Sequence, residues 1–147
     1  MNTDSNYLKH FIMVMVVMTT STMPVYSIEQ ISDLRWDARI ILVFASEEPN
    51  LYVDQLKQVN DAIEERDIYW FVLSDNKTQT NYPKQLDTNF FSNTKDKYDS
   101  GVEPKVILIG KDGYIKESSN DLNFINIFDL IDAMPMRQFE MKQQKDY

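Results

Sequence analysis

Residues 101–116 constrain the fold of this chain more than any other stretch. They read Gly-Val-Glu-Pro-Lys-Val-Ile-Leu-Ile-Gly-Lys-Asp-Gly-Tyr-Ile-Lys. The apolar run at 106–109 predicts a buried strand that follows a proline. Lys111, Asp112 and Gly113 predict a tight turn, because glycine adopts the positive φ that such turns need. A second strand returns over residues 114–117, so we expect an antiparallel hairpin that is entered through a proline-containing loop.

Two further apolar runs predict strands that are covered on both faces. Residues 39–45 and 68–73 are apolar without alternation, which is typical of strands in the middle of a layered fold. Between them, Tyr52, Leu56, Val59 and Ile63 form one apolar stripe and predict a single helix of about four turns that begins at Pro49. A strand, a helix and a strand in this order predict two parallel neighbours.

The rest of the chain predicts two more helices. The polar stretch at 74–100 is too long for a structureless loop, and residues 89–98 are its best helical segment. A last helix is expected over 122–134, capped by Asn120 and Asp121 and ended or bent by Pro135. The side chains expected to face the sheet from this helix are Phe124, Ile127, Phe128 and Ile131. Trp36, Met134 and Met136 are expected to be buried.

Three separated strings carry a family resemblance. They are Trp36-Asp37-Ala38-Arg39 ahead of Leu42-Val43-Phe44-Ala45, then Leu108-Ile109-Gly110-Lys111-Asp112-Gly113, and then Ile131-Asp132-Ala133-Met134-Pro135-Met136-Arg137 with Glu140-Met141. Over residues 31–141 the chain resembles the family called domain of unknown function 4174. The element order also resembles the thioredoxin superfamily. The resemblance implies an α/β, thioredoxin-like three-layer sandwich, with a mixed sheet of four or more strands and helices on both faces, and an exported location. It supplies no catalytic residues.

The first 27 residues are interpreted as an export signal. Lys9 and His10 precede an apolar run at 11–18, and cleavage is expected after Ser27. A membrane anchor is the alternative, but a spanning helix needs about 20 apolar residues. We therefore expect one domain over 28–147, located in the periplasm or secreted, with no membrane association after signal removal. The net charge of −8 argues against a nucleic-acid partner.

Thiol chemistry is excluded because the 147 residues contain no cysteine, and His10 is the only histidine. In a redox-active relative, the nucleophile would occupy the turn that here reads Ser46-Glu47-Glu48-Pro49. Ser46 has no histidine to activate it, so a hydrolase triad is not available. Without histidine or cysteine, only oxygen ligands remain for a metal, and no calcium-loop spacing is present, so we expect neither a metal nor a cofactor.

Two function classes remain open. One is a non-catalytic module that binds a protein or peptide in a groove formed by Ser46, Glu47, Glu48, Pro49, Glu103 and Pro104. The other is an enzyme of unrecognised type, in which Glu47 and Glu48 act as an acid and a base. Two acidic residues at a helix start also complement the helix dipole, which favours the first class. The Glu103–Pro104 bond is expected to be cis.

Overall fold

The structure, a computed structural model, describes residues 27–75, 77–102 and 104–145. Its centre is a five-stranded sheet in the order β3-β2-β1-β4-β5. The strands are β1 (Arg39–Phe44), β2 (Ile68–Ser74), β3 (Lys77–Thr80), β4 (Lys105–Ile109) and β5 (Ile115–Ser119). β1 is parallel to β2, whereas every other neighbouring pair is antiparallel. The mixed sheet expected from the sequence is therefore confirmed.

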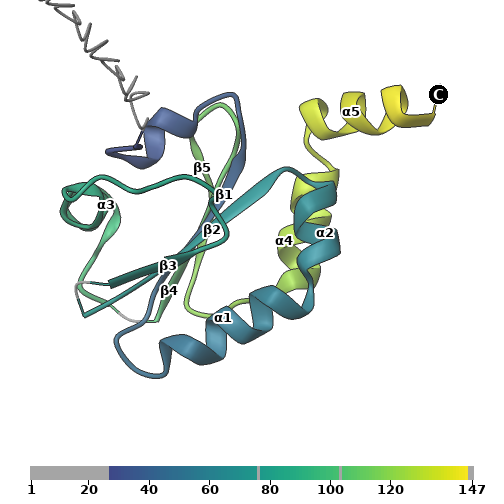
Figure 1. Cartoon of the computed structure of the whole chain (residues 1–147). Coiled ribbons are helices and arrows are strands. Elements are labelled where there is room, and N and C mark those ends of the chain that lie inside the picture. Colours follow the sequence, from purple (N-terminus) through teal and green to yellow (C-terminus); the bar gives the residue numbers. More distant parts are fainter. Residues whose placement is uncertain (1–26, 76, 103, 146–147) are drawn as a thin grey trace, which may run out of the picture.

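Helices cover both faces of this sheet (Figure 1). The helical elements are the 3₁₀ turn η1 (Ile31–Leu34), α1 (Pro49–Gln58), α2 (Asn60–Glu65), α3 (Phe90–Tyr98), α4 (Phe124–Asp132) and α5 (Pro135–Lys145). η1 and α3 contribute to the core on one face, and α1, α2 and α4 to the core on the other. α5 extends away from the sheet in Figure 1. None of the helices in the described part of the chain is long and apolar enough to cross a bilayer.

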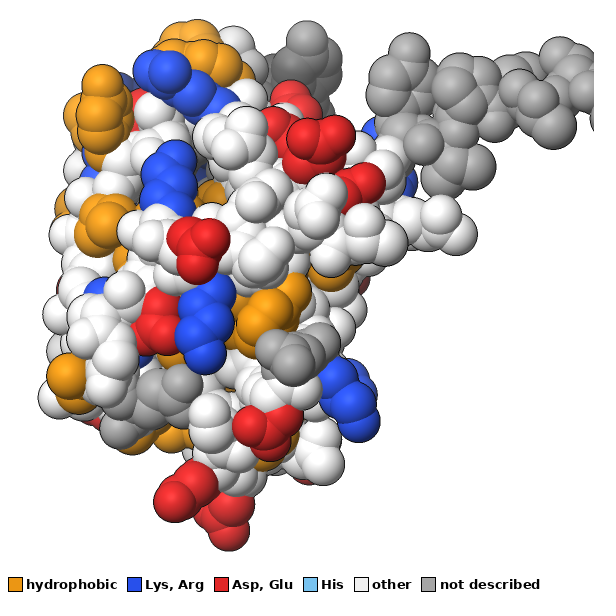
Figure 2. Space-filling model, turned by 90° about the vertical axis from the view of Figure 1, so that its left-hand side faces the viewer, with side chains coloured by type: hydrophobic (Ala, Val, Ile, Leu, Met, Phe, Trp, Pro, Cys, Tyr) orange, Lys and Arg blue, Asp and Glu red, His pale blue; other side chains and the backbone are white. Residues whose placement is uncertain are grey.

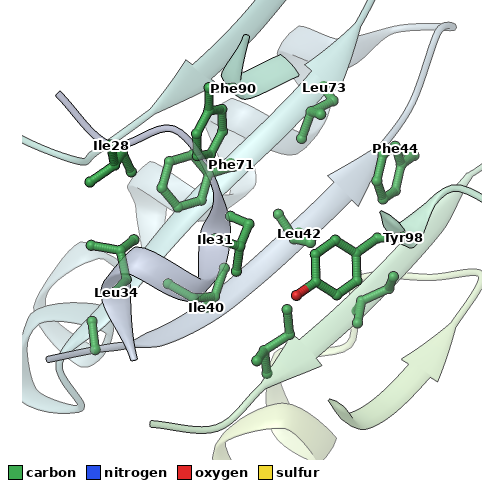
Figure 3. Packing of buried hydrophobic residues seen from close by; sticks show 13 residues of the cluster. Ile28, Ile31, Leu34, Ile40, Leu42, Phe44, Phe71, Leu73, Phe90 and Tyr98 are labelled. Carbon is green, nitrogen blue, oxygen red and sulfur yellow. The ribbon is translucent and has the colours of Figure 1, made fainter. Parts of the chain in front are cut away.

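Alternation along β1 divides the apolar residues between two cores. Ile40, Leu42 and Phe44 face the η1 and α3 side, where they pack with the cluster drawn in Figure 3. Ile41 and Val43 face α1, α2 and α4 on the opposite side. Every residue of β1 is buried, which explains why its sequence shows no polar alternation.

Helix boundaries differ from the sequence expectation in two places. The single helix predicted from Pro49 is broken at Val59, whose φ of −109° and ψ of 24° lie outside the helical region. Even so, Leu56 and Ile63, one on each side of the break, are fully buried. α4 is capped by Asn123, whose side chain accepts a hydrogen bond from the Asn126 N–H, and not by the residues predicted to cap it.

Besides the 3₁₀ turn η1, two elements were not predicted. β3 is short and polar and pairs with the end of β2, so no apolar run marks it. α5 begins at Pro135, which therefore starts a new helix after α4. Proline fits the first turn of a helix because the missing N–H has no intrahelical partner there.

The first described residues are tied to the body of the fold. Ile28 is 8% exposed and forms a bridge with Leu86. The Ile28 N–H donates to the Gln85 carbonyl at 3.4 Å, and the Asp87 N–H donates to the Ile28 carbonyl at 2.8 Å. Ile28, the residue after Ser27, is thus part of the packed structure.

An ionic cluster joins the N-terminal end of β1 to the last two helices. Its members are Arg39, Glu65, Arg66, Asp67, Lys111, Asp132, Arg137 and Glu140. Arg39 and Arg137 are each 1% exposed. A buried guanidinium without a counter-charge is costly, so these pairs hold the elements in register.

Arg137 is the centre of one half of this cluster. Its Nη2 lies 2.6 Å from Glu65 Oε1, its Nε lies 3.3 Å from Asp132 Oδ1, and its Nη1 donates to the Glu65 carbonyl at 2.9 Å. Arg66 binds the same Asp132 carboxylate through two nitrogens, at 2.6 and 3.0 Å. Asp132 therefore bridges two arginines from different parts of the chain. Arg137 thereby links α5 to Glu65 of α2 and to Asp132 of α4.

Arg39 is the centre of the other half. Its Nη1 donates to the Arg66 carbonyl at 2.8 Å, and its Nη2 lies 3.1 Å from Glu140 Oε2. Lys111 Nζ binds both Glu140 and Asp67 at 2.8 Å. Glu140 thus fixes α5 to β1 and to the turn after β4.

These contacts set the pKa of Asp132. Burial by itself raises that pKa, but the hydrogen bonds and charges of Arg66 and Arg137 outweigh the burial and hold the pKa of Asp132 below its usual value. A carboxyl with a lowered pKa in the folded state stabilises the fold above its unfolded pKa of about 3.9. That stabilisation is lost as the pH falls through the folded pKa.

We therefore expect the free energy of unfolding to fall steeply below about pH 4 and to change little through this group above about pH 5. Urea unfolding followed by circular dichroism measures it. Asp132→Asn should be less stable at neutral pH, and its free energy of unfolding should fall less steeply as the pH is lowered. Asp129→Asn, at an exposed position of the same helix, is the matched control. An equally steep fall in wild type and Asp132→Asn would contradict the prediction.

Candidate functional site

An open pocket of about 360 Å³ lies where β1 ends and α1 begins. We call it the β1–α1 groove. It is lined by Ala45, Ser46, Glu47, Glu48, Leu51, Tyr52 and Pro104. Acidic side chains lie at the lower end of the face in Figure 2, the end at which Figure 1 places the connection from β1 to α1. The groove combines acidic and apolar side chains.

The backbone of this turn explains how the acidic side chains reach the groove. Glu48 precedes α1 and has a left-handed conformation, with φ 48° and ψ 46°. A non-glycine residue in this region costs roughly 1–2 kcal/mol. Pro49 then begins the helix with its φ already suitable, and the Leu51 N–H donates to the Glu48 carbonyl at 2.9 Å. The turn thus reverses the chain within a few residues.

The two carboxylates of the groove are available to a ligand. Glu47 and Glu48 are exposed, and Glu48 makes no side-chain hydrogen bond to the start of α1. Within the described residues, no hydrogen bond or ion pair involves either carboxylate. Leu51, which is 50% exposed, half-buried Tyr52 and exposed Pro104 supply apolar surface beside them.

The groove lacks the parts of a hydrolytic or redox centre. Ser46 lines it, but the chain's single histidine lies at position 10, outside the described residues, and there is no cysteine. A catalytic pair of carboxylates needs one member shielded from water so that it keeps a proton at neutral pH. Glu47 and Glu48 are both exposed. In the described ranges, no three Asp, Glu or His side chains are placed to share a metal ion.

The sequence-predicted groove residues fall into three groups. Ser46, Glu47, Glu48 and Pro104 all line the pocket. Pro49 begins α1 beside the pocket and is not one of its lining residues. Glu103 lies outside the described residues, as does the predicted cis geometry of its bond to Pro104.

Sequence reasoning missed the apolar part of the groove. Tyr52 was assigned to the core stripe of α1 but is only half-buried, and its neighbour Leu51 was not singled out. A signal for Leu51 was present, because it lies outside the stripe of Tyr52, Leu56, Val59 and Ile63. An apolar residue on the polar side of a helix start is exposed unless something binds it.

Two predicted core residues are on the surface. Trp36 is 58% exposed and has a φ of 73°, because the positions around it that point inward are occupied by Leu34 and Ala38, each 3% exposed. Met136 is 41% exposed, whereas Met134 is half-buried against the α4 side of the core. The expectation of burial was therefore wrong for Trp36 and Met136.

Comparison with solved structures supports the fold and goes no further. The chain is similar to the reduced 2-Cys peroxiredoxin of Plasmodium vivax, with a TM-score of 0.50 and 14% sequence identity. The similarity covers 80% of this chain and 85% of that chain. At this level of identity it shows a thioredoxin-like fold alone. No protein with a curated description matches the sequence.

The family assignment comes from the sequence itself. The family model described as "Domain of unknown function (DUF4174)" matches residues 30–140. This range contains the whole sheet, the β1–α1 groove and most of the ionic cluster's helices. The chain therefore belongs to the DUF4174 family and has a thioredoxin-like fold without cysteine.

Proposed function

We propose that this protein is an exported, non-catalytic thioredoxin-like domain that binds a protein or peptide segment in the β1–α1 groove. The observation that carries the proposal is that one pocket combines apolar surface with two exposed carboxylates, neither of which is paired with another described residue. Such a pocket attracts a positive charge and buries an apolar side chain at the same time. Concave sites with few convergent polar groups are typical ligand sites.

The chemistry of the groove indicates the kind of segment that fits. Glu47 and Glu48 favour a lysine or arginine side chain, and the attraction is modest because both carboxylates are exposed. Leu51, Tyr52 and Pro104 favour an apolar side chain next to that charge. We therefore infer a basic segment that also carries an aliphatic or aromatic residue.

The alternative, an enzyme that uses the groove carboxylates, is less well supported. It requires the two carboxylates to differ in their environment so that one gives a proton and the other takes it. Glu47 and Glu48 are adjacent and both exposed. A binding role needs no such difference.

The packing of Ile28 supports the export part of the proposal. The residue after the expected cleavage site is buried and hydrogen-bonded to residues 85–87. Cleavage after Ser27 would leave these contacts in place, because a new amino group at Ile28 still has protons to donate. The mature domain would then keep the contacts that Ile28 makes with residues 85–87.

The binding role predicts a charge preference. On an array of short synthetic peptides in which a central leucine or phenylalanine is flanked by lysine, glutamine or glutamate, the lysine set should be retained best. Glu47→Lys with Glu48→Lys should weaken lysine-set binding by about tenfold, because two attractions of up to about 1 kcal/mol each become repulsions.

The matched control is Asp61→Lys with Asp129→Lys, which changes the net charge equally at exposed positions outside the groove. This control should keep the order of retention, and circular dichroism should show both variants folded. Equal retention of the three peptide sets, or equal losses in both double variants, would rule out the groove as the binding surface.

Export predicts a defined new N-terminus. N-terminal sequencing and intact mass of the exported protein should show cleavage after Ser27 or within a few residues of it. Retention of residues 1–27 in the exported protein would refute the signal interpretation.

The lack of thiols predicts no turnover in redox assays. Disulfide reduction and peroxide reduction both need an attacking thiolate and a thiol that resolves the intermediate, and the chain contains no cysteine. Purified mature protein should therefore give the buffer rate in insulin-reduction and peroxide-consumption assays, with a thioredoxin as positive control. Sustained turnover by metal-free protein would disprove the non-catalytic assignment.

A further inference from the structure

A second surface lies at the other end of β1 from the groove. Trp36 is 58% exposed and Tyr114 is 64% exposed, and both precede a strand at this end of the sheet. Near the top of the face in Figure 2, the end where Figure 1 places η1 and β5, basic side chains lie beside hydrophobic ones. Large exposed aromatic residues that gather in one place mark interaction sites.

The backbone holds Trp36 in this position. Its φ of 73° is unfavourable for a residue with a bulky side chain, and its N–H donates to the Lys111 carbonyl at 2.6 Å. This hydrogen bond ties the segment after η1 to the turn between β4 and β5. Unfavourable backbone conformations of this kind often accompany functional surfaces.

Arg35 joins the two aromatic rings. Its guanidinium carbon lies 4.9 Å from the centroid of the Trp36 ring and 6.0 Å from the centroid of the Tyr114 ring. Gly113, whose φ of 80° favours glycine, lies against the arginine stem, and a Cβ there would be in van der Waals contact with Arg35 Cδ at 3.4 Å. We call Arg35, Trp36 and Tyr114 the arginine platform.

The guanidinium of Arg35 has no polar partner in the described part of the chain. The other arginines, Arg39, Arg66 and Arg137, each form an ion pair. Its N–H groups are therefore free to bind a ligand, while the rings of the platform restrict its movement. Preorganisation of this kind lowers the entropy lost on binding.

A carboxylate matches this site. Guanidinium binds carboxylate through two parallel hydrogen bonds in a planar arrangement. The acidic side chains nearby do not compete, because Asp112 is bound by Lys116 at 2.6 Å and Asp37 lines a separate pocket beside Tyr69. The rings add apolar surface for a neighbouring side chain, and Trp, Tyr and Arg are the residues that contribute most to protein interfaces.

We propose that the arginine platform is a docking surface for an acidic segment of another protein, in which a carboxylate binds Arg35 and an adjacent apolar side chain packs on Trp36 and Tyr114. A symmetric contact with a second copy would bring two Arg35 guanidiniums together, which disfavours that occupant. A nucleic acid is disfavoured because it carries a negative charge at every phosphate, which a net charge of −8 repels, whereas the proposed contact needs only one carboxylate at Arg35. This surface is independent of the β1–α1 groove.

Fluorescence of Trp36 provides a direct test. The chain has two tryptophans, and Trp70 is 3% exposed, so ligand-induced changes in emission and in iodide quenching report on Trp36. Random peptides displayed on phage are selected on the full-length protein and counter-selected on Arg35→Gln. We expect the enriched peptides to contain Asp or Glu next to an apolar residue.

One enriched peptide and its version with glutamine in place of the acid are then titrated. Arg35→Gln should weaken binding of the acidic peptide by at least about tenfold, as should replacement of its acid by glutamine. Lys57→Gln makes the same charge change at an exposed position of α1 and should leave binding unchanged. Glu47→Lys with Glu48→Lys should not weaken it, which separates this surface from the groove.

The melting temperature of Arg35→Gln should lie close to that of the wild type, because the substitution removes only exposed contacts with two rings and no ion pair. The proposal is overturned if no acidic peptide is enriched, if the glutamine peptide binds equally, or if Lys57→Gln weakens binding as much as Arg35→Gln does. Sedimentation that shows Arg35-dependent self-association would also overturn it, since the occupant would then be a second copy.

Discussion

Burial of β1 on both faces is the constraint on which the rest of the structure depends. Its residues supply both apolar cores, and its backbone is hydrogen-bonded to β2 on one side and β4 on the other. No side chain of the strand is exposed, so none can bind a ligand. Only the segments that precede and follow the strand reach the surface. Arg35 and Trp36 of the arginine platform lie in the first, and residues 46–48 of the groove lie in the second.

Charged side chains have different roles in the groove and the arginine platform than in the ionic cluster. In the cluster, Arg39 and Arg137 are buried and bound by carboxylates and carbonyls, so their charges hold the helices in place. Arg35 and the pair Glu47 and Glu48 have no such partners in the described ranges. A charge that is exposed and unpaired contributes little to stability and remains available for recognition.

Sequence patterns predicted the elements whose side chains form the apolar core. They failed for segments whose structure does not depend on burial in that core. The runs in β1, β2 and β4 could be recognised because burial on two faces demands apolar residues throughout. β3 could not, since Lys-Thr-Gln-Thr is held by pairing with β2 and not by burial. Trp36 was misplaced because hydrophobicity indicates burial only on average, while a positive φ, invisible in the sequence, turns its side chain outward. The sequence located the groove turn because the turn lies between a predicted strand and a predicted helix. It did not reveal the apolar side of the groove, because the exposure of Leu51 and Tyr52 depends on how α1 packs.

The strand order has a consequence for how partners can bind. The two edge strands are β3, with four residues, and β5, which reads Ile-Lys-Glu-Ser-Ser. Short edges and edges with charged side chains resist the addition of a further strand, which is how sheet proteins avoid joining edge to edge. A domain without disulfides gains from this resistance, because partly unfolded chains would otherwise pair and aggregate. If the domain binds partners as proposed, side chains at the ends of the sheet would carry the recognition, and single substitutions there would change specificity without changing the fold.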